Sequence, residues 1–330
     1  MLILTKEDIE AVFSMEDAIE AVKEAFIAHS EGSVKVPLRI NIRSDKHNGN
    51  MLFMPAYCEQ KDAASLKIVS VYPDNKEKNL PSTPAQVLLI DPSTGIVLSI
   101  LDGTYITALR TGAASGAAFS VLAKSECKMG ALIGTGTQAA MQLEAMITSK
   151  KPKIVKVYSR NKERLNIFVE NMKTKFKSKD VEITAADSAD AAVEDADILI
   201  TATNSDKPLF SARSCKPGLT ISAVGSFTKQ MQELDSTVLK KASKIYYDDK
   251  EAMLEEAGEI IKALENNDID EKKLRGSLGE ALAGKIRLRE NDEEIIVFKS
   301  VGLGTQDLIT AKKVYDNAIS KKIGKHIDIG

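Results

Sequence analysis

The feature that most constrains the fold is a glycine-containing turn, LIGTGTQA, at residues 132–139. It follows an apolar run typical of a buried strand and precedes a stretch with helical spacing. In Gly134-x-Gly136-x-x-Ala139, the first glycine allows a tight turn, the second lets the backbone approach a pyrophosphate, and Ala139 allows close helix–strand packing. Free N–H groups at the start of the helix would favour the phosphates. The turn therefore predicts dinucleotide binding, with an ordinary strand–helix turn as the alternative.

Apolar runs alternate with helical stretches downstream of this turn. The candidate strands are 129–133, 154–158, 181–185, 197–201, 219–224 and 243–247. This alternation is typical of parallel strands joined by helices. We therefore expect an α/β fold with a Rossmann-type, doubly wound parallel sheet.

The first part of the chain has a different sequence pattern. Residues 14–30 have the spacing of an amphipathic helix, with Ser14 as its N-cap. Short β-type runs separated by turn signals follow from 36 to 102 and favour a largely antiparallel sheet. Helices are expected over 104–124, which is rich in Gly, Ala and Ser, and over the tail from about 304. A smaller α+β domain therefore accompanies the parallel sheet.

Charge and cysteine content narrow the classes of function. The chain has 45 basic and 47 acidic residues, interleaved rather than clustered, which argues against a nucleic-acid partner. Its three cysteines and three histidines match no metal-site spacing, so no metal is predicted. The N-terminus has no signal peptide or apolar stretch long enough to span a membrane. We expect a cytoplasmic protein that binds a small molecule.

The end of the second candidate strand bears on the choice of cofactor. An NAD-binding protein usually carries Asp or Glu there to hold the ribose hydroxyls, whereas this chain has Ser159 followed by Arg160 and Asn161. These residues offer donors for a 2′-phosphate and no carboxylate that would repel one. The cofactor is expected to be NADP or NAD, with NADP favoured; a solvated basic loop is the alternative.

Two later strand ends, at 201–205 and 222–227, fall where a doubly wound sheet opens its ligand crevice. Thr201, Val224 and Gly225 are therefore candidate nucleotide contacts, although simple ends of strands would look the same. Ser300 and Val301 follow another β-type run and are candidates to cover the nicotinamide.

The sequence also resembles the ornithine cyclodeaminase and mu-crystallin family, which includes archaeal alanine dehydrogenases and ketimine reductases. The resemblance covers nearly the whole chain. It rests on VPLRI (36–40), MLFMPAY (51–57), LKIVSVYPDN (66–75), LLIDPSTGIVLSILDG (88–103), ITALRTGAAS (106–115), LIGTGTQA (132–139), ADILITATNS (196–205), AVGSF (223–227) and VFKSVGLGTQD (297–307).

The resemblance implies a substrate-binding and dimerisation domain (1–125 with 304–330), an NAD(P)-binding domain (126–303) and a homodimer formed through the sheet. It implies that the nicotinamide meets a small amino or imino acid between the domains. The candidate substrate contacts are Arg39, Lys67, Arg110 and Val301, with Lys67 as the catalytic residue. The candidate cofactor contacts are Arg110, Thr111, Gly134, Gly136, Thr137, Gln138, Ser159, Arg160, Asn161, Thr201, Ala202, Thr203, Val224, Gly225 and Ser300.

Elementary chemistry agrees with these assignments. Arg39 and Arg110 offer the planar donor fork that suits a carboxylate. Lys67 lies in a strand that is apolar on both faces, so its ammonium needs a partner or a cleft, and burial there would lower its pKa. Such a lysine could donate a proton to a developing amine or remove one in the reverse reaction. An edge-strand lysine with its head in water is the alternative.

Two positions depart from the cyclodeaminase pattern. Phe227 occupies the place of that enzyme's catalytic Asp, and Leu52 that of a Glu in its side-chain pocket. The resemblance therefore favours hydride transfer at the C–N carbon of an amino or imino acid, as in alanine dehydrogenase or cyclic ketimine reductase. Ornithine cyclodeaminase remains an alternative, and a mu-crystallin-like binding protein is an alternative of a different class.

Overall fold

The computed structural model describes residues 1–328, and the chain divides into two compact units. Unit 1 comprises Met1–Arg110 together with the chain from Leu303 onward, and unit 2 comprises Thr111–Gly302. The division falls within helix α3 (Gly103–Leu122). The functional domain limits expected at 125 and 304 remain a prediction.

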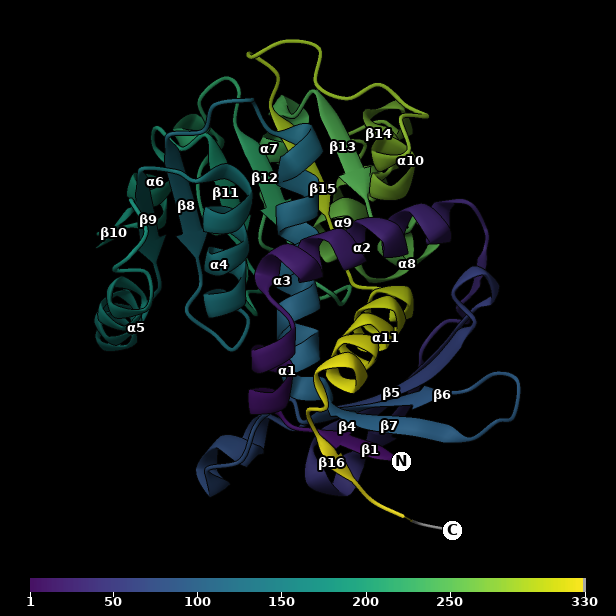
Figure 1. Ribbon diagram of the computed structural model, residues 1–330. Coiled ribbons are helices and arrows are strands. Elements are labelled where there is room, and N and C mark those ends of the chain that lie inside the picture. The colour runs from purple at the N-terminus through teal and green to yellow at the C-terminus, as the bar shows by residue number, and fades with distance from the viewer. Residues whose placement is uncertain (329–330) are drawn as a thin grey trace. The chain divides into compact units, whose positions relative to one another are not determined.

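Unit 1 is built on an eight-stranded mixed sheet (Figure 1). Seven strands run in the order β16-β1-β7-β6-β5-β4-β2, and β3 also pairs with β4. Every pairing is antiparallel except that of β1 with β7. The strands are β1 (Leu2–Leu4), β2 (Val34–Lys35), β3 (Ile40–Ser44), β4 (Gly49–Cys58), β5 (Ala63–Val71), β6 (Ala85–Ile90), β7 (Val97–Asp102) and β16 (Lys325–His326).

Helices cover one face of this sheet. In Figure 1, α11 (Gly304–Lys321) lies beside α2 (Met15–Ser30), and α11 packs on β4, β5 and β6. The third helix is α1 (Lys6–Val12). As the sequence predicts, α2 begins after Ser14, whose side chain accepts from the Asp17 backbone in a capping box. Helix α11 thereby brings the C-terminal part of the chain onto strands from the N-terminal part.

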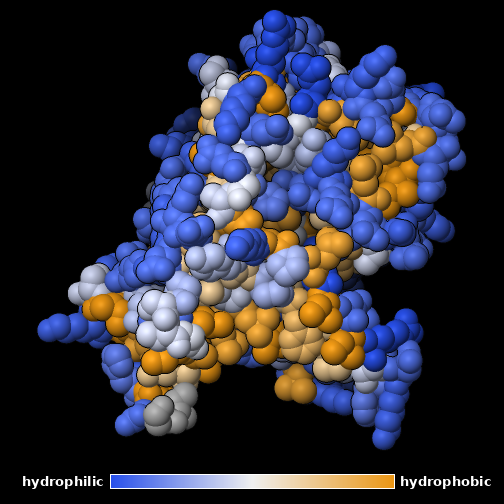
Figure 2. Space-filling model, turned by 90° about the vertical axis from the view of Figure 1, so that its right-hand side faces the viewer, coloured by the Kyte–Doolittle hydropathy of each residue, from blue (hydrophilic) through white to orange (hydrophobic). Residues whose placement is uncertain are grey.

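The opposite face of the unit 1 sheet is apolar and partly exposed. Register places Leu66, Leu88 and Ile100 in one cross-strand row on this face, and each keeps some exposure. Ile40, at the start of β3, is 59% exposed. Figure 2 shows a broad area of hydrophobic residues on the face that it presents. An apolar sheet face of this kind is typical of a protein–protein interface.

Unit 2 contains the expected parallel sheet. All of its pairings are parallel, in the order β10-β9-β8-β11-β12-β15-β13-β14. The predicted fold class is confirmed. The strands are β8 (Met129–Ile133), β9 (Ile154–Tyr158), β10 (Glu182–Ala185), β11 (Ile198–Thr201), β12 (Thr220–Ala223), β13 (Lys244–Tyr247), β14 (Leu274–Ser277) and β15 (Ile296–Lys299).

Helices cover both faces of this sheet, so the strands in its middle, β8, β11, β12, β15 and β13, are buried on both sides. On β8, Leu132 packs into the hydrophobic cluster shared with α3, α4 and α5, whereas Ala131 and Ile133 pack into the cluster shared with α6 to α9. The helices are α4 (Ala139–Lys150), α5 (Lys162–Lys175), α6 (Ala189–Val193), α7 (Ser236–Lys241), α8 (Lys250–Glu256), α9 (Gly258–Glu265) and α10 (Leu278–Leu282). Among the described residues, no helix is long and apolar enough to cross a membrane.

All six candidate strands are present, as β8 to β13, and the sheet has two more, β14 and β15. Strand β15 lies between β12 and β13. An irregular segment rather than a regular helix directly precedes β15, so the strand–helix rhythm does not assign the β-type run before Ser300 to this sheet. Its position places the residues after Lys299 next to those that follow β12.

Candidate active site

The carboxyl edge of the unit 2 sheet gathers most of the predicted cofactor contacts. Because the strands are parallel and in register, the residues that follow β8, β9, β11, β12 and β15 form one row along this edge. These residues are Gly134, Ser159, Ala202, Val224 and Ser300. The strand order reverses between β8 and β11, and such a switch point is where doubly wound sheets bind ligands.

The two glycines of the turn differ in what surrounds them. Gly134 has φ +114°, and a Cβ there would lie 2.4 Å from the carbonyl oxygen of Ala202. Gly134 is therefore required by the fold itself. Gly136 is exposed, and no atom lies within 4 Å of where its Cβ would be. That open space lies beside the N-terminus of α4, which suits a pyrophosphate.

The start of α4 has no acidic residue and no side-chain cap. Thr137 is exposed there, and the side-chain oxygen of Gln138 is buried without a hydrogen-bond partner among the described residues. Open space at Gly136, free backbone donors and an unpartnered amide together fit a dinucleotide.

The end of β9 carries the residues predicted to discriminate between cofactors. Ser159 is half-buried, and Arg160 is exposed. Asn161 caps α5, its side-chain oxygen accepting from the Arg164 backbone at 2.9 Å. The cap uses only the acceptor oxygen of Asn161, so all three side chains keep donors that could bind a ribose or its 2′-phosphate.

The predicted contacts at β11 and β12 are tied together by Glu233, which the sequence analysis missed. The Glu233 carboxylate accepts from the Thr201 hydroxyl and from the Gly225 backbone, each at 2.8 Å. It also accepts from the backbone and the hydroxyl of Thr203, at 2.7 and 2.8 Å. The donors of Thr201 and Gly225 therefore serve the fold, and Ala202 and Val224 remain at the edge.

A second buried carboxylate holds the segment after β15. Asp248, which follows β13, accepts from the Ser300 hydroxyl at 2.8 Å and from the backbones of Val301 and Gly302 at 2.8 and 2.7 Å. No local sequence pattern indicates this role for Asp248. Ser300 and Val301 are consequently buried and fixed in position within unit 2.

Unit 1 contains a buried cluster of charges around Lys67. The Nζ of Lys67 lies 2.6 Å from Oδ2 of Asp307, and the Nε of Arg110 lies 3.2 Å from Oδ1 of the same carboxylate. Arg110 also donates to the side-chain oxygen of Gln306 at 2.8 Å. All four side chains are buried. The predicted residues Lys67 and Arg110 therefore come together on a carboxylate at the start of α11.

Burial lowers the pKa of Lys67 to about 7. The negative charge of Asp307 opposes this shift, whereas the positive charges of Arg110 and Arg39 add to it. Arg39 directly precedes β3. The first residue of β3 pairs with Phe53 on β4, and the next residue along β4, Met54, pairs with Lys67. Arg39, half-buried, therefore belongs to the same cluster.

Thr111 and Phe227, two further residues from the sequence analysis, both belong to unit 2. Thr111 is half-buried in α3, and its carbonyl oxygen accepts from the Gln142 side chain at 3.0 Å. Phe227 packs partly buried against the hydrophobic cluster of unit 2.

Asp307 and Gln306 are the unit 1 residues that sequence reasoning missed. A buried lysine requires an anion, and that requirement was the signal that could have prompted a search for Asp307.

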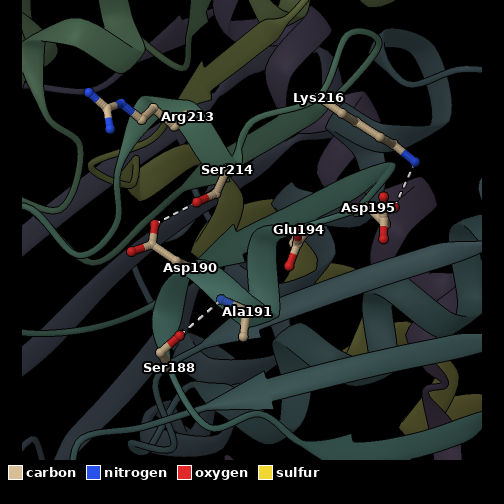
Figure 3. A pocket seen from close by; sticks show the side chains of 8 residues that line it. All are labelled: Ser188, Asp190, Ala191, Glu194, Asp195, Arg213, Ser214 and Lys216. Carbon is tan, nitrogen blue, oxygen red and sulfur yellow. Dashed lines mark hydrogen bonds between the residues drawn. The ribbon is translucent and has the colours of Figure 1, made fainter.

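Another depression in unit 2 lies beside α6 (Figure 3). Its polar side chains mainly bond locally: Ser214 donates to Asp190 at 2.6 Å, and Lys216 donates to the Asp195 carbonyl oxygen at 2.6 Å. Asp195 and Lys216 precede β11 and β12, so they lie toward the amino ends of these strands. This depression is therefore separate from the row of predicted cofactor contacts.

Comparisons with known proteins identify the family of this chain. The profile of the ornithine cyclodeaminase/mu-crystallin family matches residues 1–322. The chain belongs to this family. It is 38% identical to the alanine dehydrogenase of Archaeoglobus fulgidus, over 99% of this chain and 98% of that one.

Solved members of the ornithine cyclodeaminase/mu-crystallin family share the whole fold. The Thermococcus litoralis Delta(1)-pyrroline-2-carboxylate reductase, solved with NADH and L-proline, has a TM-score of 0.94 and 41% identity, covering 99% of this chain and all of that one. An archaeal alanine dehydrogenase dimer with bound NAD has a TM-score of 0.91 and 36% identity, covering 100% and 99%. The expected family is confirmed, and the chain is an NAD(P)-dependent oxidoreductase that acts on C–N bonds.

Proposed function

We propose that this enzyme reduces a small cyclic α-imino acid, of the Delta(1)-pyrroline-2-carboxylate type, to the corresponding cyclic amino acid. The observation that carries the proposal is the buried cluster of Lys67, Arg110 and Asp307. It offers guanidinium donors for a carboxylate and an ammonium with a pKa near neutrality for an imine nitrogen. The Thermococcus litoralis reductase, solved with L-proline, supports this substrate class.

The residues of the cluster have separate tasks in this proposal. Arg39 and Arg110 bind the substrate carboxylate, and Arg110 is held for this by Asp307 and Gln306. Lys67, oriented by Asp307, donates its proton to the nitrogen as the C=N bond becomes a C–N bond, and regains a proton from solvent. A nicotinamide bound at the carboxyl edge of unit 2 supplies the hydride for the α-carbon. In the oxidative direction, neutral Lys67 removes a proton from the amine.

Two finer points belong to the same proposal. We assign NADP as the preferred cofactor, because Ser159 and Arg160 offer donors and no carboxylate where a 2′-phosphate would lie. Relatives are solved with NADH and NAD, so NAD is the alternative. We also assign a homodimer formed through the apolar face of the unit 1 sheet, supported by the exposed Ile40 and by the dimeric archaeal relative.

Alanine dehydrogenase is the second candidate, favoured by the identity to the Archaeoglobus fulgidus enzyme. That reaction starts from pyruvate and ammonia, so it must also expel water to form the imine. A preformed cyclic imine needs only one hydride, which the reduced cofactor would supply, and one proton, which Lys67 with its pKa of about 7 can provide. This difference is why we place the cyclic substrate first.

A substrate panel tests the proposal. Consumption of NADPH or NADH is measured with the five-membered cyclic imine, with its six-membered homologue, and with pyruvate plus ammonia. Reduction of the oxidised cofactors is measured with L-proline and with L-ornithine. Faster turnover of a cyclic imine than of pyruvate plus ammonia is expected. Faster turnover of pyruvate would establish the second candidate, and release of ammonia from ornithine without net redox change would overturn the proposal.

A further inference from the structure

Glu233 lies beneath the carboxyl edge of the unit 2 sheet and is completely buried. One of its oxygens accepts from the backbone N–H and the hydroxyl of Thr203, and the other accepts from the hydroxyl of Thr201 and the backbone N–H of Gly225. The carboxylate therefore joins the chain leaving β11 to the chain leaving β12. Four donors on one side chain are far more than the capping of a loop requires.

The arrangement requires a carboxylate rather than an amide. Each oxygen faces one backbone N–H, which can only donate, so an amide would turn its NH2 group toward Thr203 or Gly225 in either orientation. The loops also fit closely. A Cβ at Gly225 would lie 2.3 Å from the Thr203 carbonyl oxygen and 2.4 Å from Oε1 of Glu233. The two strand ends consequently have one well-defined arrangement.

A buried lysine acts on Glu233 from the same face of the sheet. Register places Thr201, Ala223 and Lys299 in one cross-strand row, so their side chains point to the same side. Lys299 Nζ lies 2.9 Å from Oε1 of Glu259, and both side chains are fully buried. Burial and the negative charge of Glu259 raise the pKa of Glu233, while the positive charge of Lys299 opposes that shift. Lys299 thus helps to keep an anion beneath the two loops.

We propose that Glu233 is a positioning residue for the nicotinamide half of the cofactor. A doubly wound sheet binds one mononucleotide on each half, and the adenosine side belongs to β8 and β9, where Gly136 and Ser159 lie. The loops that Glu233 fixes belong to the other half and carry Ala202, Thr203 and Val224. The inference rests on the proposed cofactor site and assigns to Glu233 a role that none of the predicted contacts has.

The test compares two probes on the Glu233→Gln variant. One probe is NADPH or NADH, whichever the wild-type enzyme binds more tightly, and the other is the matching ADP-ribose, with a 2′-phosphate for NADPH. Leaving a buried donor without an acceptor should weaken binding of the reduced cofactor by about tenfold or more. Binding of the ADP-ribose, held by the β8–β9 half, should change by less than about twofold, and the KM for the imino acid should stay the same.

Glu259→Gln is the matched control, because it disturbs the buried Lys299–Glu259 ion pair, whereas Glu259 accepts no hydrogen bond from the described loop residues. It should lower the melting temperature and leave the Kd of the reduced cofactor within about threefold. Equal losses in both variants, or an equal loss of ADP-ribose binding by Glu233→Gln, would reduce Glu233 to a structural residue and overturn the inference. If Glu233→Gln does not fold, Thr201→Val gives the same comparison, because it removes one donor and keeps the carboxylate. An unchanged Kd of the reduced cofactor in Thr201→Val would also overturn the inference. A wild-type enzyme that binds neither reduced cofactor refutes the proposed function instead.

Discussion

Lys67 and Asp307 are 240 residues apart in the chain, yet their side chains meet in a buried ion pair 2.6 Å long. Neither group is exposed by more than 1%. A lysine buried alone would lose its proton at neutral pH, and the carboxylate limits this tendency without cancelling it. In this pair Lys67 has a pKa at which it can both donate and accept a proton near neutrality.

Replacing Lys67 with Met should abolish proton transfer while keeping an unbranched apolar side chain in the sheet. We expect kcat for imine reduction to fall by about 10²- to 10⁴-fold, the usual contribution of a general acid. The Kd of the reduced cofactor, measured by fluorescence titration, should stay unchanged because Lys67 belongs to unit 1. A kcat close to that of the wild type would contradict the assigned role.

The pH dependence should have opposite signs in the two directions. Reduction requires the Lys67 ammonium, so its kcat should fall as pH rises through about 7, whereas oxidation requires the neutral amine and should rise there. Unfolded Lys67 keeps its proton up to its ordinary pKa of 10.5, so between about pH 7 and 10.5 the unfolded state binds more protons. This group therefore makes the folded state more stable as pH rises through that range. Initial rates in both directions across this range, with Lys67→Met as the control, measure the effect.

Asp307→Asn should shift the same profile. Without the anion that raises the pKa of Lys67, reduction should decline at a lower pH than in the wild type. Breaking a buried pair should also reduce the free energy of unfolding by about 3–5 kcal/mol. Asp316→Asn removes an exposed ion pair with Lys312 on the same helix and should cost less than about 1 kcal/mol. Urea unfolding and the pH profile check both effects, and an unmoved profile would refute the coupling.

The two glycines of the dinucleotide turn should respond differently to alanine. Gly134→Ala should destabilise unit 2, because its Cβ would clash with the Ala202 carbonyl oxygen. Gly136→Ala should leave the melting temperature nearly unchanged and weaken cofactor binding, because its Cβ would enter open space that the pyrophosphate needs. Thermal melting with and without NADH or NADPH separates the two. Normal binding by a folded Gly136→Ala enzyme would place the pyrophosphate elsewhere.

Cofactor preference should depend on the end of β9. Ser159→Asp places a carboxylate where a 2′-phosphate would lie and offers it to the ribose hydroxyls, so the ratio of kcat/KM for NADPH to that for NADH should fall by about 10- to 100-fold. Lys173→Ala, an exposed change further along α5, should leave the ratio unchanged. A wild-type ratio that already favours NADH would contradict the assignment of NADP.

Features that depend on neighbouring residues could be predicted from the sequence. The turn around Gly134 and Gly136 and the strand that carries Lys67 are both local patterns, and the structure has the turn and the strand as expected. The partner of Lys67 could not be predicted, because Asp307 follows the expected start of a helix, where an acidic residue has an ordinary explanation in the helix dipole.

Glu233 and β15 were missed for a related reason. Glu233 lies in a short irregular segment before α7, where an acid is normally solvated, and only the paired ends of β11 and β12 explain its burial. Strand β15 enters the sheet between two strands that precede it in the chain. Hydrophobic periodicity describes a segment's own faces and carries no information about which strands will flank it.

The discontinuity of unit 1 has a consequence for biosynthesis. Unit 2 is a single uninterrupted stretch, so all of its strands are synthesised before α11 and β16. Unit 1 needs α11, which supplies Asp307, and β16, which pairs with β1 at Leu2 and His326. The nascent chain therefore holds the strands of unit 1 with an uncovered face, and Lys67 without its carboxylate, until the whole of unit 2 and α11 have been synthesised. Until then the nascent chain exposes apolar surface to chaperones and to other nascent chains.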